Sequence, residues 1–492
     1  MIARRLREIG VYSELFPFDV DLAELKEFHP GGIILSGGPF SVYDKEAPIR
    51  DLQPLIDMAP VLGICYGMQL LVKELGGVVE AAENREYGLN KVLWSQALHD
   101  DVPKEQKVWM SHGDVVKQIP EDFELLAVSQ GGHPAAIRSK RVWAVQFHPE
   151  VSHTDHGLEI LKAFALDLCQ LKSSWNQKFI ANYLLEEIQN KVAPNEHVLC
   201  ALSGGVDSTV VATLLTKALG PERVHCVFVN NGLLRKNEFE EVKGIYQELK
   251  LNLHTVDAEA RFLEKLKDIE DPEEKRKRIG RLFIEIFEEE CHLHKDITYL
   301  GQGTLYPDVI ESVSLRGSSV TIKSHHNVGG LPEKMNLKLI EPLRELFKDE
   351  VREIGEELGI PREILWRHPF PGPGLAVRVL GAITKEDLDT LREADHIFIR
   401  ELKESGHYRK IWQAFAALLP VRSVGVQGDG RTYGKTIVLR AITSKDGMTA
   451  DWYEFPSDFL RHVSNAITNE VKNINRVVYD VTSKPPATIE WE

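Results

Sequence analysis

The sequence has few of the residues that mark secreted, cysteine-metal or membrane proteins. Only five of its 492 residues are cysteine, and no two of them form a Cys-x-x-Cys pair, which argues against a disulfide framework and against a cysteine-bound zinc site. No apolar run reaches the ~18 residues of a membrane-spanning helix, and the first residues show no signal-peptide pattern. These absences predict a cytoplasmic protein without a membrane partner.

Basic residues are also in deficit. The chain has 59 Lys and Arg against 74 Asp and Glu, a net charge of −15. A general nucleic-acid binder needs a basic surface to meet the phosphates, so this class is excluded, whereas local basic sites for small anions stay open. Because single domains rarely exceed ~250 residues, a chain of this length is predicted to bury two or three cores.

Strand patterns alternate with helical patterns along most of the chain, which is typical of parallel sheets covered by helices. We predict two such α/β domains, at 1–170 and 175–367, joined by a polar linker. After a Pro- and Gly-rich cluster the runs become β-rich and antiparallel, which predicts an α+β domain at 368–492. Strands are expected at 32–35, 61–64, 142–147, 197–202, 224–229, 253–256, 297–301, 421–426 and 436–442.

One glycine-rich turn, Ser203-Gly-Gly-Val-Asp-Ser-Thr209, lies between an apolar strand and a helical pattern. In such a turn backbone N–H groups converge on an anion at the positive end of a helix, and Gly204 and Gly205 are both expected to permit the left-handed backbone that this requires. No Gly-Lys-Ser/Thr follows, so the pattern favours cleavage of ATP between its α- and β-phosphates. An ordinary Gly-Gly turn is the alternative.

A single cysteine has the sequence context of a nucleophile. In Gly63-Ile-Cys-Tyr-Gly67, Cys65 follows an apolar strand and precedes a helical pattern. This is typical of a nucleophile elbow, a strained turn where the helix N-terminus favours the thiolate. Backbone donors for an oxyanion hole are expected at Gly38 and Tyr66. The alternative is a buried cysteine that packs as a small hydrophobic residue.

The segment Phe147-His-Pro-Glu150 supplies a general base. A residue before proline favours extended backbone, in which residues two apart share a face, so His148 and Glu150 are expected to pair. We therefore predict Cys65 as nucleophile and His148 as general acid and base. Glu150 orients the imidazole, as in acyl transfer.

The chain combines motifs of two enzyme superfamilies. Residues 63–69, 111–114 and 147–150 resemble class I glutamine amidotransferase domains, and residues 203–208 resemble ATP pyrophosphatase domains. Further motifs that carry the resemblance lie at 301–308, 323–327, 368–374 and 483–492. Over nearly its whole length the chain is thereby similar to the glutamine-hydrolysing GMP synthase family.

This resemblance implies a ligase that makes GMP. In the family's reaction ATP adenylates the 2-oxygen of XMP with loss of pyrophosphate, and ammonia from glutamine then displaces AMP. The resemblance also implies Mg²⁺, which neutralises the charge on the leaving pyrophosphate. Asp207 is a candidate either for binding this ion or for holding the loop. A homodimer formed through the C-terminal domain is expected.

Site residues are carried over from the matching motifs. The ATP phosphates are assigned to Ser203, Gly204, Gly205, Val206, Asp207, Ser208 and Thr209. The glutamine and oxyanion site is assigned to Gly38, Tyr66 and Gln69. The XMP site, which requires a docked carboxy-terminal tail, is assigned to Arg276, Gln413, Asp429, Lys484, Ile489 and Glu490. The resemblance places residues 271–278 in a mobile lid, and a solvated helix is the alternative there.

The sequence departs from the family pattern in two places. Family members carry an apolar strand and an Asp-Phe-Gly-Ser-Gln-Tyr segment ahead of Ile2-Ala-Arg-Arg5, and neither is present here. Losing this strand would expose unpaired backbone and apolar faces of the first domain. We therefore expect either that the true start lies upstream or that this domain is impaired. Asn230 stands where aspartate is usual, and a modest effect is expected because its amide oxygen still accepts a hydrogen bond.

Two other function classes fit part of the sequence. A different ATP pyrophosphatase ligase with a fused amidotransferase, such as an NAD synthetase, accounts for the first motifs but not for the tail around Lys484. A non-catalytic assembly protein that kept the fold would be expected to lose its nucleophile or its turn. Cys65, His148 and Ser203 are all present, so catalysis is favoured.

Overall fold

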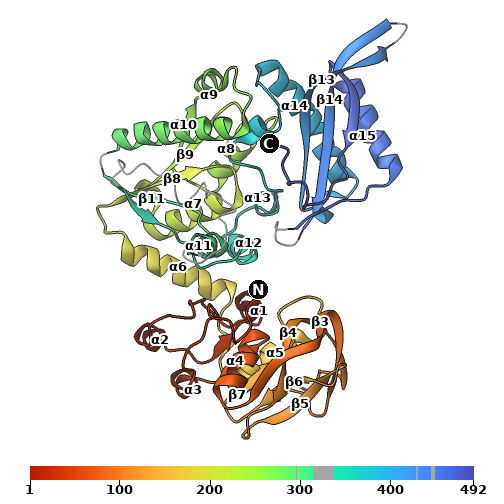
Figure 1. Cartoon of the computed structure of the whole chain (residues 1–492). Coiled ribbons are helices and arrows are strands. Elements are labelled where there is room, and N and C mark those ends of the chain that lie inside the picture. The colour runs from red at the N-terminus through yellow and green to blue at the C-terminus, as the bar shows by residue number, and fades with distance from the viewer. Residues whose placement is uncertain (295, 314–336, 428–429, 445–448) are drawn as a thin grey trace. The chain divides into compact units, whose positions relative to one another are not determined.

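The computed structural model describes residues 1–294, 296–313, 337–427, 430–444 and 449–492. Contacts divide the chain into two compact units, Met1–Phe179 (unit 1) and Ile180–Glu492 (unit 2). Figure 1 draws unit 1 in red to orange and unit 2 in yellow to blue.

Unit 1 is built on one seven-stranded sheet of mixed direction. Its order is β1-β2-β7-β6-β5-β3-β4, in which β1, β2 and β7 run parallel and the remaining pairs are antiparallel. The antiparallel half of the sheet was not predicted. Much of its strand β4 alternates exposed and buried residues, which is the pattern of a sheet with one solvent-exposed face. The strands are β1 (Ile33–Leu35), β2 (Val61–Ile64), β3 (Val78–Trp94), β4 (Glu105–Gln118), β5 (Glu124–Ser129), β6 (Pro134–Arg138) and β7 (Val142–Val145).

Strand β2 is buried on both faces, and this fixes the position of the residue that follows it. Val61 packs in one hydrophobic core, and Leu62 and Ile64 pack in a second core. A central parallel strand has this all-apolar pattern because helices cover both of its faces. The helices of the unit are α1 (Ile2–Glu8), α2 (Leu22–Phe28), α3 (Gln53–Met58), α4 (Tyr66–Glu74), α5 (Gly157–Lys162) and the π-helix η1 (Ala163–Leu168).

Unit 2 contains a five-stranded parallel sheet with the order β10-β9-β8-β11-β12. Its strands are β8 (His197–Leu202), β9 (Val224–Asn230), β10 (Leu253–Asp257), β11 (Ile297–Gly301) and β12 (Lys338–Ile340). The chain runs outward from β8 to β10 and then returns to the other side of β8. This reversal creates a switch point between β8 and β11, where α/β proteins bind ligands at the carboxyl ends of the strands.

Helices connect the strands of unit 2, and none of the described helices has the length and apolar character that crossing a membrane requires. Those before the last sheet are α6 (Gln177–Lys191), α7 (Val206–Leu219), η2 (Pro221–Arg223), α8 (Glu238–Glu248), α9 (Glu259–Leu266), α10 (Pro272–Leu293), α11 (Tyr306–Val313), α12 (Lys348–Glu357), α13 (Arg362–Leu365) and η4 (Gly374–Val377).

A second sheet of unit 2 is formed by the last part of the chain. Strands β13 and β14 are antiparallel as predicted, β15 extends the sheet, and β16 pairs in parallel with β14. One hydrophobic core includes Leu199, Leu388, Ala416 and Ile474, so both sheets of the unit share it. The elements are α14 (Lys385–Glu404), η5 (Tyr408–Lys410), β13 (Gln413–Gln427), β14 (Gly430–Thr443), β15 (Asp451–Trp452), α15 (Ser457–Glu470) and β16 (Ile474–Tyr479).

The predicted mixed α/β class, with an antiparallel sheet at the end, is confirmed. The division into three domains at 1–170, 175–367 and 368–492 stays a prediction.

Two candidate catalytic centres

The predicted elbow is present in unit 1 between β2 and α4. Cys65 has a backbone φ of 53° and ψ of −107°, a conformation that costs a non-glycine residue of order 1–3 kcal/mol and is concentrated at active sites. The backbone N–H of Cys65 donates to the carbonyl of Val145 at 2.9 Å. A Cβ on Gly67 would lie 2.2 Å from the carbonyl oxygen of Leu35. The second glycine of the motif therefore allows helix α4 to start against the neighbouring strand.

His148 lies between the thiol and a carboxylate. Its Nδ1 is 2.9 Å from Oε1 of Glu150. A Cβ on Gly37 would lie 2.9 Å from Cε1 of His148 and 3.5 Å from the Cβ of Cys65, so the imidazole and the thiol are neighbours. The Cys65 thiol donates to the carbonyl of Ser111 at 3.6 Å. The predicted pairing is thus present, although the extended backbone expected for it is not, because the described strand ends at Val145 and the next residues form bends and a turn. The proline turn, rather than strand geometry, brings the two side chains together.

The environment of His148 favours the imidazolium form. Burial alone would lower its pKa, but the hydrogen bonds to Cys65 and Glu150 and their negative charges outweigh burial and raise the pKa of His148 to about 10. A protonated imidazole beside a thiol is the arrangement that supports a thiolate nucleophile.

The predicted glutamine and oxyanion residues surround the elbow. A Cβ on Gly38 would come within 3.7 Å of the ring of Tyr66, so these two residues are neighbours. Tyr66 is the first residue of α4. The side-chain amide of Gln69 donates to the carbonyl of Asp114 at 3.0 Å and to Gln146 at 3.3 Å, which positions β4 against the helix. These contacts place the residues but leave their roles as predictions.

The predicted pyrophosphate turn joins β8 to α7 at the switch point of unit 2. Gly204 has φ +76°, as expected, but Gly205 has φ −84° and is the residue before the helix. The expectation of a left-handed backbone at both glycines was therefore wrong for Gly205, because a single reversal already turns the chain into the helix. Ser203 and Ser208 bond to each other across the turn at 3.1 Å.

The carboxylate of Asp207 already has a cationic partner. Nζ of Lys348, on α12, lies 2.5 and 2.6 Å from its two oxygens. A Cβ on Gly303 would lie 2.9 Å from the Cβ of Asp207, so the segment after β11 closes over the same residue. Two further charged residues border the turn, since Arg367 donates to the carbonyl of Gly204 at 3.1 Å and pairs with Glu238.

Asn230 makes the hydrogen bond expected of it. Its Oδ1 accepts from the backbone N–H of Gly232 at 3.2 Å, and its Nδ2 donates to Asp257 at 3.1 Å. An aspartate at position 230 would place its carboxylate beside that of Asp257, and the two negative charges would repel each other. Asparagine avoids this repulsion and donates a hydrogen bond instead.

The carboxy-terminal tail is docked, as the XMP assignment requires. The guanidinium of Arg378, which has no exposed surface, donates to both carboxylate oxygens of Glu490 at 2.9 and 3.1 Å. Gln413 donates to the same carboxylate at 2.6 Å. The backbone of Lys484 pairs with Ala450. Two predicted XMP residues, Gln413 and Glu490, are therefore in contact.

The acidic-then-basic run at 271–278 is the start of helix α10 rather than a wholly solvated segment. Lys275 is fully buried and donates to the carbonyl of Val379 and to the carboxylate of Glu492. Arg276 donates to the carbonyl of Glu492 at 2.6 Å. Helix α10 thus holds the end of the tail, and Figure 1 shows the carboxy terminus beside it.

Two of the predicted motifs are not placed. Asp429 and residues 323–327 lie outside the described residues, so nothing is added to the predictions made for them. Ile489 is half-buried within the docked tail.

Several charged residues of these centres were not predicted. Lys348, Arg367 and Arg378 lie in segments without a recognised local motif, and each meets its partner across more than 100 residues. Each of them pairs with an acid from a distant segment, Asp207, Glu238 and Glu490 respectively, and this signal exists only in the folded chain.

Models of three protein families match the chain. "Glutamine amidotransferase class-I" matches residues 1–168, "NAD synthase" residues 177–278 and "GMP synthase C terminal domain" residues 400–491. Together with the two centres, these matches define a glutamine amidotransferase joined to an ATP pyrophosphatase.

Relatives that match over the full length of the chain identify the family within this class. A GMP synthase (glutamine-hydrolysing) of Bdellovibrio bacteriovorus is 62% identical over 492 residues, covering 100% of this chain and 97% of its own. One of Pelodictyon phaeoclathratiforme is 55% identical over 504 residues, with 100% and 97% coverage. The chain belongs to the family of glutamine-hydrolysing GMP synthases, and the predicted ligase function, GMP synthesis with ATP and glutamine as nitrogen donor, is confirmed.

Proposed function

We propose that the chain converts XMP to GMP in two half-reactions, glutamine hydrolysis in unit 1 and ATP-dependent adenylation in unit 2. The first half is supported by the His148–Glu150 hydrogen bond beside Cys65. Cys65 itself has a backbone conformation that is concentrated at active sites. The second half is supported by the Ser203–Thr209 turn at the switch point of the parallel sheet.

In unit 1 the Cys65 thiolate attacks the carboxamide carbon of glutamine, and the backbone N–H groups near Gly38 and Tyr66 stabilise the oxyanion. The His148 imidazolium donates its proton to the departing nitrogen, so ammonia leaves and a thioester remains. Neutral His148 then takes a proton from water as it attacks the thioester, and glutamate is released. Glu150 holds the imidazole in place through both steps.

In unit 2 the turn binds the phosphates of ATP while the 2-oxygen of XMP attacks the α-phosphate. Pyrophosphate leaves, and the adenylated carbonyl carbon becomes open to attack by ammonia, with AMP as the second leaving group. Lys348, whose ammonium lies at Asp207 in this structure, is close enough to the turn to pair with the phosphates. The ammonium would stabilise the negative charge that develops on the leaving pyrophosphate.

The donors at the turn fit Mg²⁺, a hard cation that binds one or two carboxylates together with substrate phosphates. Asp207 would hold it, which requires the Lys348 ammonium to shift from that carboxylate. Bound there, the ion would neutralise negative charge on the pyrophosphate.

For XMP we propose a site at the docked tail. Arg276 and Lys484 are cations suited to its phosphate, and Glu490 suits a ribose hydroxyl or a base N–H. The bonds that hold Glu490 to Arg378 and Gln413 support this proposal because they orient the carboxylate. Asp429 and Ile489 remain part of the proposed site.

A homodimer formed through the last part of the chain is also proposed. Four apolar side chains are exposed on the hairpin of β13 and β14: Val421, Val424, Val426 and Tyr433. Exposed apolar surface of this kind marks interaction sites, and a second copy of the chain is the partner that the resemblance implies. Action in the cytoplasm fits the free cysteines.

The decisive experiment measures AMP and GMP formed from ATP and XMP, with glutamine or ammonia as nitrogen donor. Cys65→Ala is expected to abolish the glutamine-dependent reaction and leave the ammonia-dependent one, since only the thioester chemistry is lost. The control is Cys169→Ala in the same unit, because burial raises the pKa of Cys169 to about 12 and keeps that thiol protonated. Equal loss of both reactions in Cys65→Ala would contradict the two-centre proposal.

A further inference from the structure

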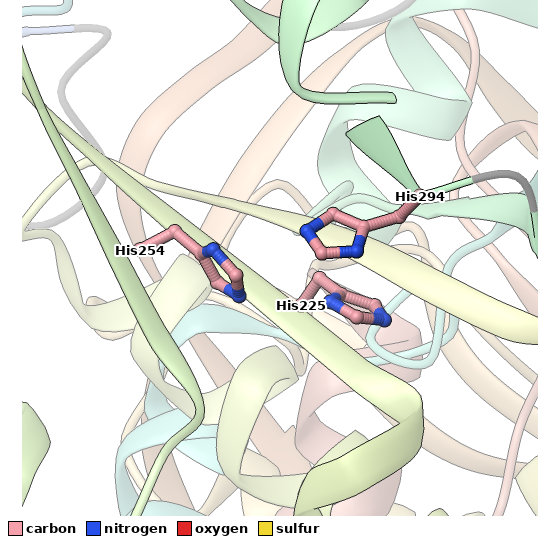
Figure 2. Close-up of side chains that lie close together, drawn as sticks. All are labelled: His225, His254 and His294. Carbon is pink, nitrogen blue, oxygen red and sulfur yellow. The ribbon is translucent and has the colours of Figure 1, made fainter. Parts of the chain in front are cut away.

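Three histidines meet at the amino ends of the parallel strands of unit 2, the edge opposite to the pyrophosphate turn. His225 is the second residue of β9, His254 is the second residue of β10, and His294 follows the last residue of α10. Figure 2 shows their imidazoles side by side, with ring centroids 4.3 to 5.6 Å apart. One candidate ligand nitrogen from each ring lies within 4.8 Å of the other two.

Two of these nitrogens lack a hydrogen-bond partner among the described residues. Nδ1 of His225 and Nε2 of His254 are both buried and unpaired, and the residue His225 is only 7% exposed. Leaving a buried polar atom unpaired is costly, so each such atom calls for an explanation. A shared ligand for the three rings would satisfy both atoms at once.

A fourth histidine is hydrogen-bonded to the most buried ring. Nε2 of His225 lies 2.9 Å from Nδ1 of His197, on the adjacent strand β8. If Nε2 carries the proton and donates it to His197, Nδ1 of His225 keeps its lone pair and is free to bind a metal. A second residue that fixes the ligand's tautomer in this way is characteristic of histidine metal sites.

We propose that His225, His254 and His294 form a binding site for a divalent transition-metal ion, with Zn²⁺ as the preferred cation. Imidazole nitrogen suits zinc, and three protein ligands plus one solvent molecule complete its usual four-coordinate shell. Zn–N bonds of ~2.0–2.1 Å place tetrahedral ligand nitrogens about 3.4 Å apart. The ligand nitrogens lie within 4.8 Å of one another, so side-chain rotations that close the spacing by up to about 1.4 Å suffice. Asp296 adds a negative charge beside the cluster.

The site would join three elements that are far apart in the sequence. Binding links the starts of β9 and β10 to the carboxy-terminal end of α10, the helix whose other end holds the tail through Lys275 and Arg276. Because the ligands are brought together only in the folded chain, binding stabilises the folded state. The role is structural and separate from the chemistry of the pyrophosphate turn.

The test uses untagged full-length protein, stripped with a chelator and then loaded with Zn²⁺ or Co²⁺ alone. We expect one tightly bound Zn²⁺ per chain by elemental analysis, and a visible Co²⁺ spectrum of four-coordinate nitrogen ligation without thiolate charge-transfer bands. At Zn²⁺ concentrations ~100-fold above Kd, the unfolding temperature of unit 2 is expected to rise by about 4 °C.

The double variant His254→Asn/His294→Asn should lose the bound ion, the spectrum and the thermal shift. His292→Asn is the matched control, because this exposed histidine lies in the last turn of α10, two residues before His294. Wild-type protein that binds no Zn²⁺, or a folded double variant that keeps it, would overturn the proposal. If the double variant does not fold, the Co²⁺ spectrum of wild-type protein decides, since a sulfur-ligated or six-coordinate spectrum excludes this site.

Discussion

The ammonium of Lys348 lies 2.5 and 2.6 Å from the two carboxylate oxygens of Asp207. The residues are 141 positions apart, and the pair joins α12 to the first turn of α7. Asp207, the acid assigned to ATP, is thereby held by Lys348, the lysine that we propose pairs with the phosphates. Lys348 is partly exposed, so the pair by itself is expected to add little to stability.

Lys348→Ala is expected to lower ATP-dependent GMP synthesis with either nitrogen donor, through a KM for ATP raised roughly tenfold or more. The reason is that the variant lacks the cation proposed to pair with the pyrophosphate, whereas the glutaminase centre is untouched. Initial rates over a series of ATP concentrations, with ammonia as donor, measure the effect. Lys217→Ala, an exposed lysine near the other end of α7, should behave as wild type. Unchanged ATP kinetics in Lys348→Ala would restrict this lysine to holding the helices.

The two glycines of the turn are expected to differ in their tolerance of a side chain. Gly204→Ala forces a residue with a Cβ to φ +76°, which costs ~1–3 kcal/mol, so GMP formation from ammonia should fall roughly tenfold or more. Gly205→Ala keeps an ordinary φ of −84°, and its Cβ meets only the rotatable hydroxyl of Ser203 at 3.1 Å. Steady-state assays should rank Gly204→Ala well below Gly205→Ala, and the opposite ranking would contradict the backbone geometry described here.

Glu150→Gln is expected to lower the pKa of His148 and to slow glutaminase activity by roughly 10²-fold or more. The carboxylate favours the imidazolium, so its removal favours the neutral ring. The rate of Cys65 alkylation by iodoacetamide, followed by mass spectrometry of its peptide from pH 5 to 10, reports the change in the Cys65–His148 pair. Glu121→Gln, an exposed acid of the same unit, is the control and should leave the profile unchanged.

The raised pKa of His148 also predicts how the stability of unit 1 depends on pH. His148 has a folded pKa of about 10 against an ordinary value of 6.5, so its contribution is fully present below pH ~6.5 and is lost as the pH rises through ~10. The temperature of glutaminase inactivation should therefore fall over this range in wild type. A decline of equal size in Glu150→Gln would show that other groups cause it.

Lys484→Ala should raise the KM for XMP roughly tenfold or more and leave the KM for glutamine unchanged. The size follows from the ~1.5–3 kcal/mol that a hydrogen bond to a charged group contributes. Lys472→Ala, an exposed lysine just before β16, is the control. Ammonia-dependent rates at varied XMP concentrations separate binding from the glutaminase step. Normal XMP kinetics in Lys484→Ala would give the tail a structural role alone.

The features that the sequence alone determined are local ones. The elbow at Cys65, the turn at Ser203–Thr209 and the pairing of His148 with Glu150 each arise within a few residues, where glycine, proline and strand patterns restrict the backbone directly. The family resemblance extended these motifs to the whole reaction. Even here the local geometry was only partly foreseen, since Gly205 has an ordinary φ and a turn, not a strand, presents Glu150.

Only the tertiary structure decided which distant charges meet. Lys348 reaches Asp207, and Arg378 reaches Glu490, because sheet order and helix packing bring separate segments together. The histidine cluster has the same origin. Strands β9 and β10 are neighbours in the sheet, so His225 and His254, the second residue of each strand, lie at the same edge, and the end of α10 adds His294. A sequence specifies these contacts only through the complete fold, because no local rule links residues that are 29 to 141 positions apart.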